Sequence, residues 1–315
     1  MRRKRARAPL TEAGEAEPSK RASKRASWNL KEGAAIAEGR TVMSQLGGGS
    51  RYEVYLVWDD GLFSLAVAKL LRPDRLNDER ALRDLAAEAE ILEATAHPVI
   101  VRGFDYVLDG LHPHLLIEHL EGPTLRALIR RGGPLELQQL LPLALHIVAA
   151  LQYLSNQGLV HLDVKPDNIV MGVPPRLIDL SVARSLERAA STSSPVGTDA
   201  YMAPEQCDPA SGGPVGSPAD VWGWGATLFH AVTGRVPFPR ASEARHSPDR
   251  SIRFPQLDQP PGSIAAGVPG ELKELILSTM QRDPQARPGA AELADQLEPL
   301  VAELPRRISL SRRGK

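Results

Sequence analysis

The chain has one cysteine, Cys207, and aromatic side chains make up only 4% of its 315 residues. A lone cysteine excludes an internal disulfide and is typical of proteins in a reducing compartment. Lysine plus arginine (38) balance aspartate plus glutamate (38), so bulk charge points to no particular partner. No stretch approaches the roughly 18 to 20 uninterrupted apolar residues that a membrane span requires, and the basic N-terminus lacks an apolar signal core. We therefore expect a cytoplasmic protein without a membrane partner.

Both ends of the chain are basic and lack apolar periodicity. Residues 1–27 and 306–315 are rich in arginine, which predicts disordered tails. In the first tail, Ser23 and Ser27 each follow an arginine by two positions, so a phosphate there could pair with neighbouring basic side chains. We expect a solvated N-terminal tail, and we regard nucleic acid as an unlikely partner outside this segment.

One polar turn carries the residue types that transfer of a phosphoryl group needs. It reads His161-Leu162-Asp163-Val164-Lys165-Pro166-Asp167-Asn168 and lies between a long apolar segment and a short apolar strand. In such a turn Asp163 can accept a proton from an attacking hydroxyl, Lys165 can steady a γ-phosphate and Asn168 can help to hold a metal ion. Asp179 ends the next short strand, where a carboxylate can complete a Mg²⁺ site.

Upstream of this turn, strand-like runs surround a cluster of glycines. Runs at 41–46 and 52–58 flank Gly47-Gly48-Gly49, and another run covers 63–71. Glycines between two strands let backbone amides approach phosphates closely. Lys69 lies in the apolar run Ala66-Val67-Ala68-Lys69, and Glu88 lies on a helix predicted at 80–94. A pair between Lys69 and Glu88 would explain a charge inside a strand and would aim the ammonium at nucleotide phosphates.

The remaining patterns predict a second hairpin and a series of helices. The hairpin covers 104–108 and 114–118, and the connector 118–122 follows it with backbone groups that could bind an adenine edge. Periodicity predicts helices at 124–131, 135–157, 219–232, 271–281 and 290–303. The proline-rich region 235–270 yields no assignment. His112, His114, His146 and His230 show no metal-ligand spacing.

In this order, the signals resemble the protein kinase family, most closely bacterial serine/threonine protein kinases of the eukaryotic type. The resemblance covers residues 41–301 and includes Ala203-Pro204-Glu205, Asp220 and Arg287. It implies an α+β, bilobal protein-kinase-like fold. A small antiparallel β-sheet lobe with one main helix (41–118) would join, through a hinge (118–122), a larger mainly helical lobe (123–301). It also implies ATP and Mg²⁺ as cofactors and proteins as substrates, with autophosphorylation among the reactions.

The resemblance also implies a role for each matching residue. The catalytic set would be Asp163 as base, Lys165 as a γ-phosphate contact, and Lys69 paired with Glu88. Asn168 and Asp179 would bind the metal. The nucleotide site would comprise Gly47, Gly48, Gly49, Val54, Ala66, Lys69, Ile117, Glu118, Leu120, Asn168 and Asp179. Elsewhere, Glu205 and Arg287 would form a buried ion pair, Asp220 would hold the catalytic-loop backbone, and Thr198 would lie near Asp163 and Lys165.

Three positions depart from the family pattern. Tyr52 stands in place of a glycine, so we expect a glycine loop that closes less tightly. Leu162 replaces the arginine that usually precedes the catalytic aspartate, so a phosphate on a hydroxyl of residues 191–194 would lack its usual partner. Ser181 stands where Asp-Phe-Gly is usual in the family, and it restricts the backbone flipping that glycine permits.

Three functions compete on this evidence. We favour an active ATP- and Mg²⁺-dependent serine/threonine kinase. The first alternative is a pseudokinase scaffold, against which the retention of Lys69, Asp163, Asn168 and Asp179 counts. The second is a small-molecule kinase with the same His-x-Asp…Asn arrangement, and here Lys165, Glu205 and Arg287 favour protein substrates instead.

Overall fold

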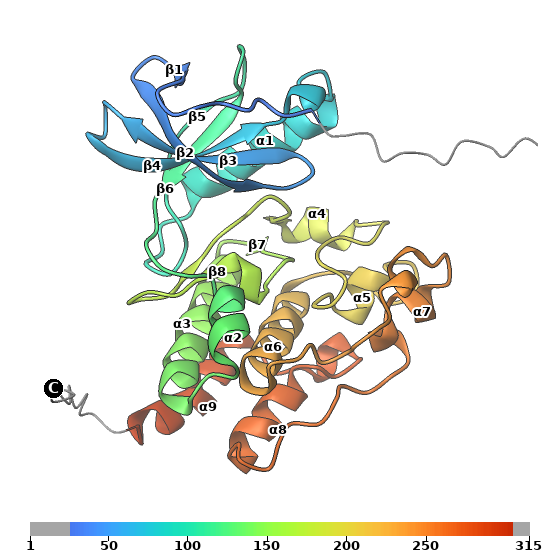
Figure 1. Ribbon diagram of the computed structural model, residues 1–315. Coiled ribbons are helices and arrows are strands. Elements are labelled where there is room, and N and C mark those ends of the chain that lie inside the picture. Colours follow the sequence, from blue (N-terminus) through green and yellow to red (C-terminus); the bar gives the residue numbers. More distant parts are fainter. Residues whose placement is uncertain (1–25, 305–315) are drawn as a thin grey trace, which may run out of the picture.

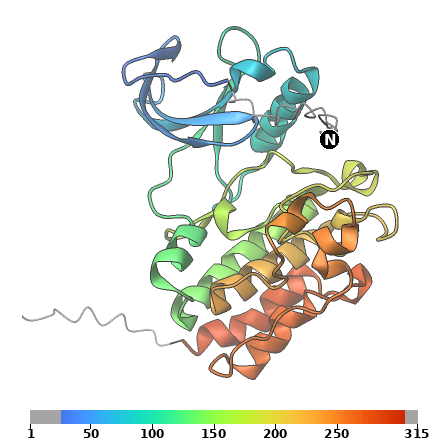
Figure 2. The same ribbon diagram turned by 45° about the vertical axis from the view of Figure 1, so that its right-hand side comes forward.

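A computed structural model describes residues 26–304, which form two lobes (Figure 1). The smaller lobe is a six-stranded antiparallel sheet with helix α1, and the larger lobe is mainly helical. Figure 2 shows the same two lobes joined by extended chain. The predicted α+β, two-lobed architecture is therefore confirmed. The predicted tails fall outside the described residues, apart from residues 26 and 27.

The sheet of the smaller lobe has the strand order β1-β2-β3-β4-β6-β5. Its strands are β1 (Ala35–Ala37), β2 (Arg40–Gly48), β3 (Tyr52–Asp59), β4 (Ser64–Leu71), β5 (Gly103–Val107) and β6 (His114–Glu118). This lobe begins before residue 41, where the sequence pattern placed its start. The indole of Trp28 donates to the Leu71 carbonyl at 2.8 Å and packs edge-on against His112.

Helix α1 (Glu79–Ala94) follows the 3₁₀ turn η1 (Pro73–Arg75) and packs against strands β5 and β6 of the sheet. Its N-cap, Asp78, accepts hydrogen bonds from two backbone amides of the first turn, as a capping carboxylate does. Ala81, Leu85, Glu88 and Leu92 recur at helical spacing and are buried, so one face is apolar except at Glu88. Burial of the Glu88 carboxylate costs free energy, and this carboxylate faces the strand that carries Lys69.

The larger lobe is built around helices α3 and α6, both apolar on most sides. Its helices are α2 (Leu125–Gly132), α3 (Leu137–Asn156), α4 (Leu186–Ala190), α5 (Pro204–Cys207), α6 (Ser217–Thr233), α7 (Arg250–Arg253), α8 (Gly270–Ser278) and α9 (Ala290–Ala302). Among the described residues, α3 alone has the length and apolarity to cross a membrane. Here it packs against α6 and α9 as a core helix.

Helix α6 touches the catalytic loop and the C-terminal helices at once. A side chain at Gly225 would collide with Thr279, and one at Gly223 would press on Val164 at 3.2 Å. Glycine at these positions lets α6 approach both segments closely. The helix ends at Gly234, whose φ of 73° is the left-handed conformation that glycine adopts readily. Residues 235–270, unassigned from sequence, contain α7 and the 3₁₀ turns η3 (Glu243–His246) and η4 (Pro255–Leu257).

Short elements fix the loops between the lobes. The catalytic turn runs from β7 (Leu159–Val160) through the 3₁₀ turn η2 (Pro166–Asn168) into β8 (Ile169–Val170). Strand β8 pairs with β9 (Arg176–Leu177), and β7 pairs with β10 (Arg184–Ser185). The last 3₁₀ turn, η5 (Pro284–Ala286), precedes Arg287. These pairings hold the turn and the segment after Asp179 beside each other.

Candidate active site

A cavity of about 910 Å³ lies between the two lobes. It is bordered by the glycine turn, β4, α1, the connector after β6, and the segments around Asn168 and Asp179. Most residues predicted for a nucleotide site line it: Gly48, Gly49, Val54, Lys69, Ile117, Glu118, Leu120, Asn168 and Asp179, together with Glu88. The structure therefore gathers residues from distant parts of the sequence around one space.

Two predicted nucleotide-site residues do not line this cavity. Side chains alternate along a strand, so the residue that shares the face of Lys69 on β4 is Val67, two positions earlier. Val67 lines the cavity, whereas Ala66 is fully buried in the small core on the opposite face of the sheet. On β4, therefore, Val67 rather than Ala66 borders the cavity. Gly47 pairs with Val54 at the end of β2 and also lies outside the lining.

A backbone hydrogen bond between Gly49 and Tyr52 closes the glycine turn. The Gly49 amide donates to the Tyr52 carbonyl at 2.9 Å, and a side chain at Gly48 would meet that carbonyl at 2.8 Å. Tyr52 itself points into the core, where the Lys69 ammonium lies 4.6 Å from its ring centroid. Burial raises the pKa of Tyr52 to about 12, so the phenol stays neutral. The residue that departs from the family pattern thus packs against Lys69.

The ammonium of Lys69 bridges two carboxylates from different lobes. Its Nζ lies 2.8 and 2.9 Å from the Glu88 oxygens and 2.7 Å from Asp179 Oδ1. Burial opposes the charge of Lys69, but Asp179 and Glu88 outweigh it and hold its pKa above the ordinary value. Burial also works against the Asp179 carboxylate, yet Lys69 keeps its pKa well below the usual range. Burial raises the pKa of Glu88 despite Lys69. Lys69 and Asp179 are therefore both charged.

Asp163 lies in the catalytic turn with one oxygen engaged and one free. Lys165 Nζ donates to Asp163 Oδ2 at 2.6 Å and to Thr198 Oγ1 at 2.6 Å. The Asn168 amide donates to the Asp163 backbone carbonyl at 3.0 Å and to Oδ2 at 3.2 Å. Asp163 Oδ1 is buried and has no hydrogen-bond partner among residues 26–304. An unpartnered buried carboxylate oxygen is costly, which points to a role in binding a donor that arrives from outside.

The backbone of this turn is held by a buried aspartate on α6. Asp220 accepts from the amides of His161 and Leu162, both at 2.7 Å, which is the anchoring role predicted for it. Leu162 needs such support because its φ of 63° is unfavourable for a side chain with a Cβ. Sequence reasoning missed Gln206, whose amide donates to the Leu162 carbonyl at 2.9 Å. Only its position next to Glu205 could have singled it out.

The loop of hydroxyls at 191–194 does have a guanidinium beside it. Arg184 of β10 donates to Thr192 Oγ1 at 3.3 Å. Leu162 still stands in place of the usual arginine, and Arg184 supplies a different basic group beside Thr192. Strand β10 pairs with β7 just before the catalytic turn, which brings Arg184 to this place.

Glu205 and Arg287 form an ion pair at the base of the segment that follows Thr198. Arg287 contacts both carboxylate oxygens, at 2.6 and 2.9 Å, and both side chains are almost completely buried. The guanidinium also donates to the Pro218 and Gln281 carbonyls and stacks over Trp222. A buried charge pair needs such extra partners to offset its desolvation. It ties α5 to the start of α6 and to η5.

Asn168 and Asp179 offer oxygen donors at the edge of the cavity. The described residues contain no cluster of three or more His, Cys, Asp or Glu side chains that could hold a metal ion. Asn168 uses its amide nitrogen on Asp163, so its oxygen is the atom left for a cation, and the Asp179 carboxylate is ionised. One carboxylate and one carboxamide fit Mg²⁺, which takes few protein ligands and completes its shell with phosphate and water.

Comparisons with known proteins agree with this geometry. The family model described as protein kinase domain matches residues 40–297. The chain is 34% identical over 261 residues to the probable serine/threonine-protein kinase PkwA of Thermomonospora curvata, a match that covers 81% of this chain and 33% of that protein. It is 30% identical over 257 residues to the serine/threonine-protein kinase PrkC of Bacillus subtilis, covering 80% and 38%. The chain thus spans about a third of the length of these relatives. Together with the site described above, the match over residues 40–297 shows that the chain belongs to the protein kinase family.

Proposed function

We propose that this chain transfers the γ-phosphate of ATP to serine and threonine hydroxyls of proteins, itself included. The observation that carries the proposal is the free Oδ1 of Asp163, which lies beside the engaged Lys165 and Thr198. A hydroxyl that enters here meets a carboxylate oxygen ready to accept its proton. The names of the relatives support serine and threonine as acceptors.

In this proposal the nucleotide occupies the cavity between the lobes. The Leu120 backbone makes no hydrogen bond within residues 26–304, so it is open to the edge of a base, whereas the Glu118 amide already donates to the Arg102 carbonyl at 2.9 Å. The Glu118 carboxylate is also engaged, by Arg176 at 3.0 Å. Lys69 holds the phosphates through its positive charge, and Val67 packs against the base from β4.

The chain's own residues position the reactants and neutralise charge. Asp163 orients the acceptor hydroxyl and takes its proton, and Lys165 carries positive charge next to the site of transfer. Mg²⁺, held by Asn168 and Asp179, would supply neutralisation of the phosphate oxygens. Because these groups are preassembled by Asp220 and Glu88, little reorganisation accompanies transfer.

Protein substrates are favoured over small molecules by the segment from Gly197 to Glu205. Thr198 accepts a hydrogen bond from Lys165, and Glu205 pairs with Arg287, so the segment is fixed at both contacts beside Asp163. We call this segment the ledge. An extended polypeptide can lie on such a ledge and present one hydroxyl.

The lone, buried Cys207 supports the further proposal that the protein works in a reducing compartment such as the cytoplasm.

The test is transfer of labelled phosphate from ATP with Mg²⁺ to a generic protein substrate and to the protein itself. We expect label on serine or threonine, and mapping would show whether Ser27 or Thr192 receives it. Nucleotide binding without any transfer to proteins would favour the scaffold alternative. Transfer to small hydroxyl compounds alone would favour the small-molecule kinase.

A further inference from the structure

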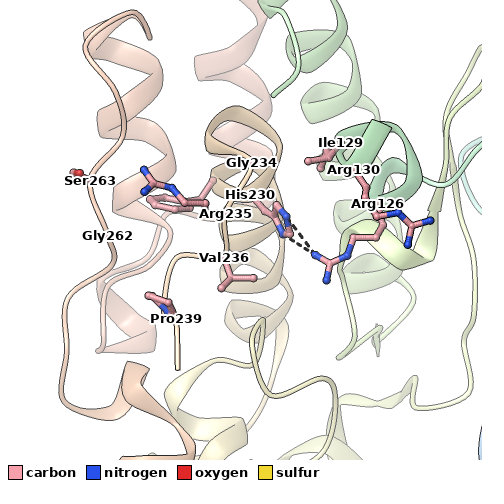
Figure 3. Close-up of a pocket in the computed structure, with 11 residues that line it drawn as sticks. Arg126, Ile129, Arg130, His230, Gly234, Arg235, Val236, Pro239, Gly262 and Ser263 are labelled. Carbon is pink, nitrogen blue, oxygen red and sulfur yellow. Dashed lines mark hydrogen bonds between the residues drawn. The ribbon is translucent and has the colours of Figure 1, made fainter. Parts of the chain in front are cut away.

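A second cavity, of about 890 Å³, opens on the helical lobe between α2, the C-terminal end of α6 and the segment after it (Figure 3). Helix α2 contributes Arg126 and Arg130, α6 contributes His230, and the chain beyond Gly234 contributes Arg235. Figure 3 shows His230 between the α2 arginines and Arg235. Neither aspartate nor glutamate is among its lining residues.

The three guanidinium groups of this cavity have no close ion-pair partner in the part of the chain that the structure describes. None of them forms a salt bridge with a carboxylate of residues 26–304, whereas nearby Arg240 and Arg253 both pair with Asp199. Asp167 acts electrostatically on His230 and Tyr201 but forms no salt bridge with these arginines among the described residues, so three cationic side chains at one hollow favour an anion from outside. Guanidinium groups suit carboxylate and phosphate oxygens in particular, because their N–H groups can donate in pairs.

Arg126 is held in place by neutral groups. Its NH1 lies 3.3 Å from both ring nitrogens of His230 and 3.3 Å from the Tyr201 hydroxyl, which in turn lies 2.6 Å from His230 Nδ1. Burial and Arg126 lower the pKa of His230 to about 4, although Asp167 opposes this. The ring therefore stays neutral at physiological pH and orients Arg126 without cancelling its charge.

Tyr201 connects this cavity to the catalytic turn. Its amide donates to the Thr198 carbonyl at 2.8 Å, and the Thr198 hydroxyl accepts from Lys165. Helix α2 also packs on the turn Pro166–Asn168. The cationic cavity is thus connected to the segment from Gly197 to Glu205, on which an acceptor polypeptide would lie.

We propose that this cavity binds an anionic side chain of the protein substrate, a carboxylate or a phosphate group close in sequence to the acceptor residue. Arg126 forms the oriented contact, and Arg130 and Arg235 add charge from either side. The inference rests on the proposed function and adds a substrate preference to it. It predicts that acidic segments are better substrates than basic ones.

The test compares serine peptides that differ in one residue. Glutamate is moved through the five positions on each side of the acceptor, and each peptide is matched by one with glutamine there. At one or two positions we expect kcat/KM for the glutamate peptide to exceed that for the glutamine peptide by about tenfold. In the Arg126→Gln variant the ratio of these two kcat/KM values should fall to near one. Arg126→Lys should retain part of it, and Arg131→Gln, an exposed neighbour outside the cavity, should retain all of it. A phosphoserine at the same position distinguishes phosphate from carboxylate as the preferred anion.

A binding assay separates this inference from the proposed function. A fluorescent glutamate-rich peptide is titrated into the Asp163→Asn protein, with the Arg130→Gln/Arg235→Gln variant in that background as a second test of the same cavity. Binding that these substitutions and added salt weaken would support the cavity even if no phosphate transfer occurs. Equal kcat/KM for glutamate and glutamine peptides at every position, with active enzyme, would overturn the inference and leave the kinase activity intact.

Discussion

Lys69 of the smaller lobe and Asp179 of the larger lobe lie in direct contact, with Lys69 Nζ 2.7 Å from Asp179 Oδ1. The same ammonium holds Glu88 of α1, so a single charge links the helix, the sheet and the segment that follows β9. The two lobes therefore meet at the place where the proposed function puts nucleotide phosphates and a metal ion. Removal of any member should disturb the others, because each is partly or fully buried.

Substitution of Glu88 tests this link. Glu88→Gln removes the carboxylate that orients Lys69 from α1, so the ammonium is left to Asp179 alone. We expect kcat/KM for ATP to fall on the order of a hundredfold, as for loss of one preorganised electrostatic contact. Glu90→Gln, on the exposed side of the same helix, is the control. Similar kinetics for the two variants would refute the role of the pair.

Val67 and Ala66 provide a test of which face of β4 meets the nucleotide. Val67→Ala removes two methyl groups from the cavity wall, and loss of their contacts should weaken ATP binding by roughly three- to tenfold. Ala66→Gly alters the opposite face and should change stability while ATP affinity stays constant. Isothermal titration of both variants decides the matter, and a weaker affinity only in Ala66→Gly would contradict the assignment.

The ion pair between Glu205 and Arg287 should dominate the stability of the helical lobe. Arg287→Met leaves the Glu205 carboxylate buried without a partner, so the free energy of unfolding should drop by about 3 to 5 kcal/mol. The double variant Glu205→Gln/Arg287→Met removes both charges and should recover much of the loss. Urea unfolding followed by tryptophan fluorescence, to which Trp222 under Arg287 contributes, measures this. A double variant as unstable as the single one would rule out an unpaired charge as the cause.

His230 should make the protein less stable in mild acid. Its pKa is lowered from about 6.5 in the unfolded chain to about 4 by burial and Arg126, with Asp167 acting in the opposite direction. Below pH 6.5 the unfolded chain binds a proton that the folded protein does not. The contribution of the neutral ring is thus complete above pH 6.5 and is lost as the pH falls toward 4.

Between pH 7 and pH 5, His230→Gln should therefore lose about 1 to 2 kcal/mol less stability than the parent protein. The exposed His246→Gln substitution should leave the pH dependence unchanged. Denaturant unfolding at both pH values provides the comparison. An identical pH dependence in the His230 variant and the parent would show that the ring does not titrate in this way.

The sequence predicted most of the architecture because strong local signals coincide with the elements. Strand β4 and helix α1 begin within one residue of their predicted starts, since a turn precedes the strand and Asp78 caps the helix. Asp163, Lys165 and Asn168 come from one turn, so their spacing alone placed them together.

What the sequence did not reveal depends on contacts between distant residues. The position of Ala66 away from the cavity depends on which face of a strand meets the cavity, which a single charged residue did not settle. The contact of Arg184 with Thr192 follows from the pairing of β10 with β7, and the cationic cavity follows from the packing of α2 against the end of α6. Neither pairing leaves a short-range pattern.

The most direct test of the account is the effect of Asp163→Asn on transfer and on binding, measured in the same preparation. The substitution keeps the shape of the side chain but removes the base, so we expect the rate of phosphate transfer to fall by roughly a hundredfold or more while ATP affinity changes little. Asp295→Asn, an exposed position on α9, should behave as the parent does. Undiminished transfer by the Asp163 variant would contradict the assignment of Asp163 as the base and with it the central claim.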